Sequence, residues 1–136
     1  MPWKSWQALC LLLLPLSFCR ATSAAPLPCS NATLKGTYLY NSSGVLNGQP
    51  YAESGREEYD GKGGIVLNYQ GSDGAGGVEV GRYSVSGDCI GTMWYPDGQK
   101  ATSFISPDGS RFTYTITTAP GKETTALSGW EFRVAP

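Results

Sequence analysis

Apolar and polar residues alternate with a period of two over much of the chain, as they do in β-strands with one buried face. Clusters rich in glycine, aspartate and proline separate these runs, and Asp60-Gly61 is a strong hairpin signal because both residues tolerate the backbone of a tight turn. The pattern predicts eight short strands, over residues 33–40, 51–59, 65–69, 78–85, 89–95, 100–106, 111–118 and 124–134.

Short strands at near-regular spacing with turns between them predict an all-β fold, either an antiparallel barrel or a sandwich. We expect a single closed eight-stranded barrel, because an open meander would leave two strand edges exposed. Side chains can fill the interior of such a barrel, or it can hold one small ligand, and the sequence leaves both possibilities open.

The N-terminal segment has the features of a secretory signal peptide. Lys4 precedes an apolar run over residues 8–18, and small residues follow it up to Ala24. The run is too short to span a bilayer. We therefore predict a signal peptide over residues 1–24, a barrel domain over 25–136, and a secreted or periplasmic protein. The alternative is a lipoprotein anchor at Cys19.

Cysteine usage supports an exported protein. Cys10 and Cys19 would leave with the signal peptide, and Cys29 and Cys89 would remain. In an oxidising compartment we expect these two to form one disulfide, with two free buried thiols as the alternative. Two cysteines in a chain without histidine make a poor zinc site, so no metal is predicted.

The charge and the missing residue types exclude several functions. The chain has a net charge of −1, and removal of Lys4 and Arg20 would make it more acidic. Nucleic acid requires a basic surface, so nucleic-acid binding is not expected. The absence of histidine excludes Ser-His-Asp and Cys-His nucleophiles. No phosphate- or dinucleotide-binding glycine motif occurs in a strand-to-helix setting, so no cofactor is predicted, and no second apolar span follows the signal.

Carboxylates remain as candidates for chemistry. In the predicted strand 51–59, Glu57 shares a face with Tyr51 and Tyr59. If this face is interior, burial would raise the pKa of Glu57 and make it a possible general acid or base, with Arg82 as a partner. Alternatively, Glu57 lies near the barrel mouth or pairs structurally with Arg82.

Aromatic residues are numerous for a short domain, and they could line a ligand site or simply form the core. Over residues 124–134, Trp130 and Phe132 share a face that we expect to be buried, opposite Leu127 and Glu131. The candidate ligand-binding residues are Tyr38, Tyr69, Arg82, Trp94, Tyr114 and Trp130.

Several segments carry a family resemblance: Cys29 to Tyr38 (CSNATLKGTY), Tyr59 to Gly63 (YDGKG), Gly81 to Val85 (GRYSV), Asp88 to Thr92 (DCIGT) and Ser128-Gly129. Through them, nearly all of the chain after the signal resembles a group of uncharacterised bacterial exported proteins. The resemblance implies a small barrel similar to those of the allene oxide cyclase and dirigent type, within the wider group of lipocalin- and avidin-like barrels. This is a likeness of fold and not of function.

Because a catalytic set is absent, we expect a non-catalytic exported module that binds a small apolar ligand or a protein partner. One alternative is a barrel cyclase or isomerase similar to allene oxide cyclase, working through Glu57. Another is a self-assembling extracellular structural component. An open cavity with Glu57 facing into it would favour the enzyme, whereas a filled interior with an exposed apolar patch would favour assembly or partner binding.

Overall fold

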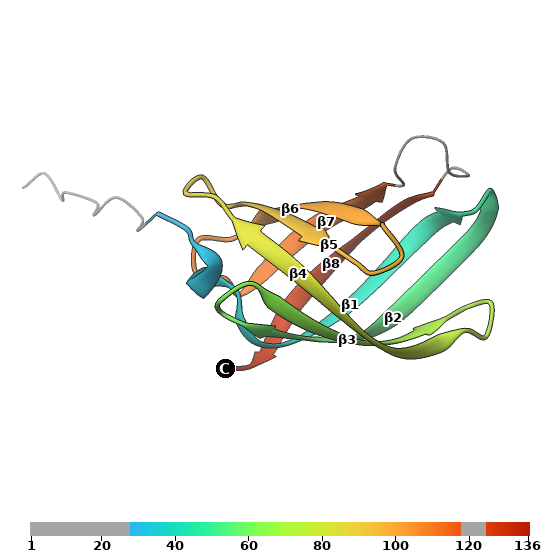
Figure 1. The fold of residues 1–136 in the computed structure, drawn as a ribbon, viewed down its shortest axis with the longest axis horizontal. Coiled ribbons are helices and arrows are strands. Elements are labelled where there is room, and N and C mark those ends of the chain that lie inside the picture. Colours follow the sequence, from blue (N-terminus) through green and yellow to red (C-terminus); the bar gives the residue numbers. More distant parts are fainter. Residues whose placement is uncertain (1–27, 118–124) are drawn as a thin grey trace, which may run out of the picture.

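A computed structural model describes residues 28–117 and 125–136. Eight antiparallel strands form one closed barrel in which each strand pairs with its sequence neighbours and the last strand closes on the first (Figure 1). The predicted all-β barrel is therefore confirmed. The strands are β1 (Lys35–Leu46), β2 (Gln49–Asp60), β3 (Gly64–Gly71), β4 (Gly76–Val85), β5 (Ile90–Trp94), β6 (Lys100–Ile105), β7 (Arg111–Thr117) and β8 (Ala126–Ala135).

The predicted signal peptide lies outside the described residues, as do Cys10 and Cys19. The predicted disulfide joins Cys29 to Cys89 and is confirmed. No helix in the described segments is long and apolar enough to cross a membrane.

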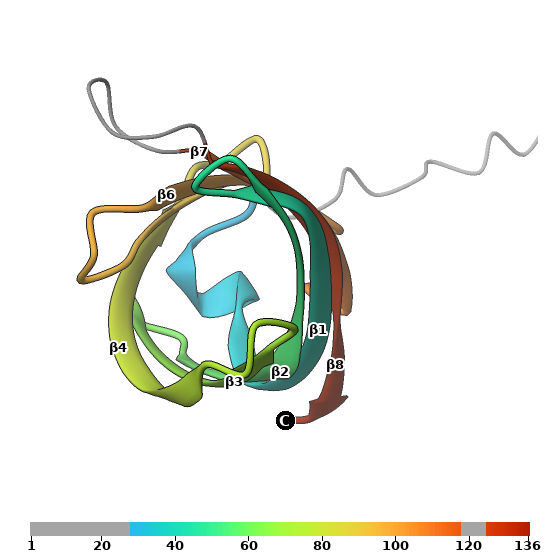
Figure 2. The ribbon, with the colours of Figure 1, turned by 90° about the vertical axis from the view of Figure 1, so that its right-hand side faces the viewer.

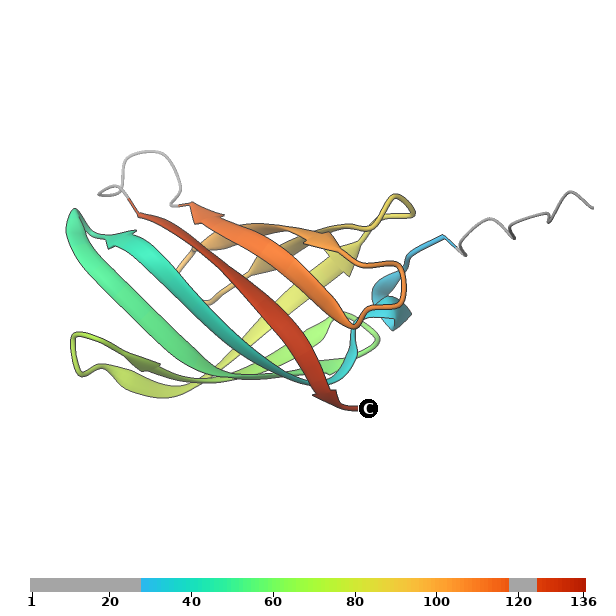
Figure 3. The same cartoon turned by 180° about the vertical axis from the view of Figure 1, so that it is seen from behind.

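Strand β1 is longer than the alternation predicted, because the polar stretch after Tyr40 continues the strand instead of ending it. Ser42 in this stretch points inward and is buried. At Gly44 the backbone of β8 approaches so closely that a Cβ atom would lie 2.1 Å from the carbonyl oxygen of Ala126. The small polar residues thus allow β1 to pair along its length with both β2 and β8 (Figure 3).

One end of the barrel is closed by a short 3₁₀ helix, η1 (Asn31–Thr33), which Figure 2 shows across the opening of the ring. The Tyr83 hydroxyl lies 2.9 Å from the carbonyl oxygen of Asn31 and 2.8 Å from that of Leu34. The Asn31 side chain accepts a hydrogen bond from the Val85 amide at 2.8 Å. Together with the disulfide of Cys29, these contacts hold the N-terminal lead-in against β4.

An aromatic cluster fills the half of the barrel next to η1. The ring of Tyr59 packs edge-on against Tyr38, Tyr83 and Phe112, with centroids 5.1 to 5.9 Å apart. Such edge-to-face contacts add to the free energy gained by burying the rings. Tyr38, a candidate ligand-binding residue, is fully buried in this cluster, and its hydroxyl donates to the carbonyl oxygen of Gly109 at 2.5 Å. Tyr38 therefore belongs to the packed core.

The expected burial of the two faces of β8 is wrong. Leu127 and Glu131 are 3% and 1% exposed, whereas Trp130 and Phe132 are 48% and 38% exposed and stack on each other on the outer surface. The inward position between Leu127 and Glu131 is Gly129, where a Cβ atom would lie 2.8 Å from the Tyr114 ring. Because Tyr114 from β7 already fills this space, β8 turns its large aromatics outward.

Candidate functional site

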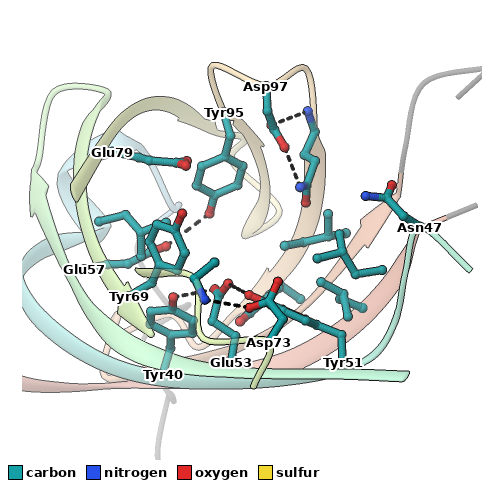
Figure 4. Close-up of a pocket in the computed structure, with 17 residues that line it drawn as sticks. Tyr40, Asn47, Tyr51, Glu53, Glu57, Tyr69, Asp73, Glu79, Tyr95 and Asp97 are labelled. Atoms are coloured by element: carbon teal, nitrogen blue, oxygen red, sulfur yellow. Dashed lines mark hydrogen bonds between the residues drawn. The ribbon is translucent and has the colours of Figure 1, made fainter. Parts of the chain in front are cut away.

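The aromatic cluster does not fill the whole interior. A cavity of about 240 Å³ opens at the end of the barrel away from η1, between the β1–β2, β3–β4 and β5–β6 turns (Figure 4). Its walls come from residues that alternate with outward-facing ones along β1 to β4, β7 and β8, so strand pleating places each side chain there. The interior is thus filled at one end and open at the other.

Glu53 organises two tyrosines on one wall of the cavity. The hydroxyls of Tyr40 and Tyr51 donate to its two carboxylate oxygens at 2.6 and 2.7 Å (Figure 4). Tyr40 can lie over β2 because position 55 is glycine, where a Cβ atom would come within 2.7 Å of the ring. Burial and the neighbouring Glu53 carboxylate raise the pKa of both tyrosines, which stay protonated donors.

The deepest carboxyl that lines the cavity is Glu57, which is 2% exposed. It accepts hydrogen bonds from the hydroxyl of Tyr59 and, at 3.1 Å, from that of Tyr95. Burial raises its pKa to about 7, although these hydrogen bonds act in the opposite direction. Glu57 therefore faces the interior among tyrosines, which is one of the two arrangements that the alternation on β2 left open.

Behind Glu57 lies a second buried carboxyl, Glu131, which the sequence interpretation had placed on the outer face of β8. The Tyr59 hydroxyl lies 3.3 Å from Glu131 Oε2. Burial, followed by the negative charge of Glu57, raises the pKa of Glu131 well above its usual value. Burial therefore favours the protonated form of Glu131, and the Tyr59 hydroxyl lies within hydrogen-bond distance of both buried carboxyls.

Three further acids lie at the mouth of the cavity: Asp73, Glu79 and Asp97 (Figure 4). Asp73 accepts a hydrogen bond from the Ala75 amide at 2.9 Å, which fixes the β3–β4 turn. Asp97 accepts one from the Gln99 amide at 2.9 Å in the β5–β6 turn. Partial burial raises the pKa of Glu79, and the negative charges of Asp97 and Glu53 raise it further.

The opposite side of the cavity is apolar. Leu46 near the end of β1, Ile116 on β7 and Leu127 on β8 line it together. Ile116 and Leu127 are direct partners across the β7–β8 ladder, so their side chains lie next to each other. The cavity therefore has acidic residues from β2, β4 and the turns and an aliphatic patch from β1, β7 and β8. Its tyrosines come from β1, β2, β3, β7 and the β5–β6 turn.

The predicted site residues fall into two groups. Glu57, Tyr69 and Tyr114 line the cavity. Arg82, Trp94 and Trp130 lie on the outer surface, together with the exposed valines of β4. Arg82 and Trp94 are register partners outside the barrel, because they alternate with the buried Tyr83 and Met93. The prediction that Arg82 pairs with Glu57 is thus wrong.

Sequence reasoning missed most of the other polar lining residues. Glu53 was detectable, since it shares the inward face of β2 with Glu57. Glu79 gave no such signal. It lies between Val78 and Val80, and the alternation suggested that the valines point inward and Glu79 outward. Within residues 28–117 and 125–136, no group of three histidine, cysteine or acidic residues could hold a metal ion.

Comparison with known proteins supports the fold. No family model and no curated protein matches the chain. The redesigned β-barrel mFAP1, bound to DFHBI, is 24% identical with a TM-score of 0.53, over 76% of this chain and 97% of that chain. The redesigned barrel mFAP0, also bound to DFHBI, is 22% identical with a TM-score of 0.50, over 74% and 99%. The siderocalin Ex-FABP is 10% identical with a TM-score of 0.43, over 75% and 71%.

These likenesses and the strand order define the class of protein. It is a closed, eight-stranded, antiparallel β-barrel with the same overall fold as the redesigned barrels mFAP1 and mFAP0.

Proposed function

We propose that this protein is a non-catalytic barrel that takes one small organic molecule into the cavity at its open end. The observation that carries the proposal is the half-filled interior. The aromatic cluster reaches Glu57 through the hydroxyl of Tyr59, and Glu57 borders a space of about 240 Å³. A cavity of roughly 150 Å³ is enough to bind benzene. The space therefore suits a molecule with one ring and a short side chain.

The mixed lining supports the same function. Ligand sites usually combine apolar walls with a few well-placed polar groups, as the leucines and tyrosine hydroxyls do here. The barrels mFAP1 and mFAP0 are bound to DFHBI in their structures, so barrels similar to this one hold small molecules. Fold likeness alone does not carry a function, and the cavity of this chain is the main support.

The protein acts outside the cytoplasm in this proposal. The Cys29–Cys89 disulfide supports export, because such bonds persist in oxidising compartments. Mass spectrometry of the protein secreted by its host should find an N-terminus near Ala25. A lipid-modified N-terminus at Cys19 would contradict the predicted cleavage after Ala24.

A second candidate is a cyclase or isomerase, favoured by one specific observation. Glu57 borders the cavity with a pKa of about 7, so it could accept and return a proton near neutral pH. Recovery of a bound molecule unchanged after long incubation supports the binding function, whereas its conversion by the wild type and not by Glu57→Gln would support the enzyme.

Self-assembly by edge pairing is not part of the proposal. All eight described strands pair on both sides in the closed barrel, so none presents an unpaired edge.

The cavity can be tested with three one-ring probes, phenethylamine, 2-phenylethanol and 3-phenylpropionate, in ligand-observed NMR. Leu46→Trp should fill the mouth and abolish binding, because Leu46 lines the cavity and is only partly buried. Ala52→Trp is the matched control, since it adds the same side chain at an exposed position of β2. Binding of none of the probes to the wild type, or unchanged binding to Leu46→Trp, would contradict the proposal.

A further inference from the structure

The cavity lining has an uneven charge. Among the described residues that line it, five are acidic and none is lysine or arginine: Glu53, Glu57, Asp73, Glu79 and Asp97. Arg56 lies on the outer surface of β2, where its guanidinium group forms a salt bridge with the Glu58 carboxylate at 3.4 Å. Glu53 and Glu79 are half-buried in this lining, so water screens their charges less than on an open surface, whereas Asp73 and Asp97 are exposed at the mouth.

The carboxylates act on one another across this space. Ionisation of Glu79 is opposed by burial and then by the charges of Asp97 and Glu53, which lie on other elements of the barrel. Like charges that approach in a partly dry site cost free energy until a cation enters between them. A positively charged ligand would remove this cost, and an anion would increase it.

Aromatic rings border the same space. Tyr40 donates a hydrogen bond to Glu53, and Tyr95 donates one to Glu57 (Figure 4). Tyr69 interacts with Glu79. The face of an aromatic ring attracts an ammonium group, more strongly where water is excluded. The tyrosines and carboxylates of this wall thus favour the same charge.

The arrangement of the acids suits an organic cation better than a metal ion. They come from β2, β4 and two separate turns, and the described residues contain no group of three that could hold a metal. The facing wall of Leu46, Ile116 and Leu127 offers only aliphatic contacts. A molecule that satisfies both walls carries a positive charge at one end and an apolar body at the other.

We infer that the ligand of this barrel is a small organic ammonium ion with an apolar body of about one ring, its charge toward Glu53 and Glu79 and its apolar part against Leu46, Ile116 and Leu127. This inference rests on the proposed function, since it specifies the molecule that enters the same cavity.

Calorimetric titration of the purified protein at neutral pH tests the inference with the same three probes. Phenethylamine, 2-phenylethanol and 3-phenylpropionate share a ring and a two-carbon spacer, and they are a cation, a neutral molecule and an anion. We expect phenethylamine to bind about tenfold or more tightly than the alcohol, and the anion to bind most weakly.

Variants locate the effect in the cavity. Glu79→Gln should weaken phenethylamine about fivefold to tenfold and leave the alcohol unchanged, because it removes one charge near the ammonium group. Glu53→Gln should do the same, although it also removes an acceptor for Tyr40 or Tyr51. Glu58→Gln is the matched control: it removes a charge from the outer face of β2 and should change neither affinity.

The outcomes separate the two proposals. If the alcohol or the anion binds as tightly as the amine, the inference is overturned while the proposed binding function stands. If Glu58→Gln weakens the amine as much as Glu79→Gln does, the effect comes from general surface charge and the inference is also overturned. If no probe binds, the proposed function itself fails.

Discussion

Glu57 and Glu131 approach each other inside the barrel from the two strands that flank β1, and the hydroxyl of Tyr59 lies between them. Both carboxyls are almost fully buried, and the charge of each is disfavoured by burial. Burial, together with the negative charge of Glu57 on Glu131, therefore favours the protonated forms of these carboxyls. This pair gives the barrel a pH-dependent stability.

We predict that the protein is more stable at pH 5 than at pH 8. The pKa of Glu57 is raised from 4.5 to about 7 in the folded state, so folding binds a proton in this window. The stability that such a group contributes is fully present below its pKa in the unfolded chain. It is lost as the pH rises through its pKa in the folded protein. The loss from Glu57 amounts to about 3 kcal/mol, and the raised pKa values of Glu131 and Glu79 add in the same direction.

Urea unfolding at pH 5, 6, 7 and 8 measures this dependence. The lowered pKa values of Asp60 and Asp108 affect stability only at more acidic pH, so they do not interfere. Glu57→Gln should flatten the profile, and Glu58→Gln, on the outer face of the same strand, should leave it unchanged. An increase in the free energy of unfolding from pH 5 to pH 8 would show that the carboxyl pair is ionised in the folded protein.

The disulfide should make a large contribution to stability. Cys29 and Cys89 are 60 residues apart, and closing a loop of this length restricts the unfolded chain by about 4 kcal/mol in the chain-entropy model. Replacing both cysteines with alanine should lower the free energy of unfolding by up to this amount. Mass spectrometry without reduction should find one linked pair in the wild type, and two alkylatable thiols would refute the bond.

The two faces of β8 should respond differently to truncation of their side chains. Leu127→Ala removes a buried side chain and should cost roughly 2–5 kcal/mol. Trp130→Ala removes a larger side chain that is half exposed on the outer surface, and it should cost much less. Thermal or urea unfolding of both variants measures the difference, and a larger loss for Trp130→Ala would reverse the assignment of the faces.

A chain that ends at Thr125 should be unfolded or aggregated. Strand β8 pairs with β1 on one side and β7 on the other, so its loss would expose two strand edges. It would also remove the buried Leu127 and Glu131. Calorimetry should show no cooperative transition, and a transition near that of the full-length chain would mean that the sheet does not need closure.

The strand order could be predicted because it depends on local chemistry. Period-two alternation and turn residues such as Asp60-Gly61 define where strands begin and end, and short turns force neighbours in sequence to pair. Closure of the barrel could be predicted because unpaired strand edges are unfavourable. The Cys29–Cys89 disulfide could be predicted because disulfides form and persist in an oxidising compartment. Alternation also placed Glu57 on the same face of its strand as Tyr51 and Tyr59, but it did not decide whether that face is the inner one.

Only the tertiary structure decided which face of β8 is buried and what surrounds Glu57. Alternation separates Trp130 from Glu131 but does not say which points inward; that depends on the space left by neighbours such as Tyr114 over Gly129. Likewise, Glu57 meets Tyr95, which directly follows β5, and Glu131 from β8 because closure brings distant strands around one interior. The half-open interior has the same origin, since its volume depends on how side chains from all the strands pack together.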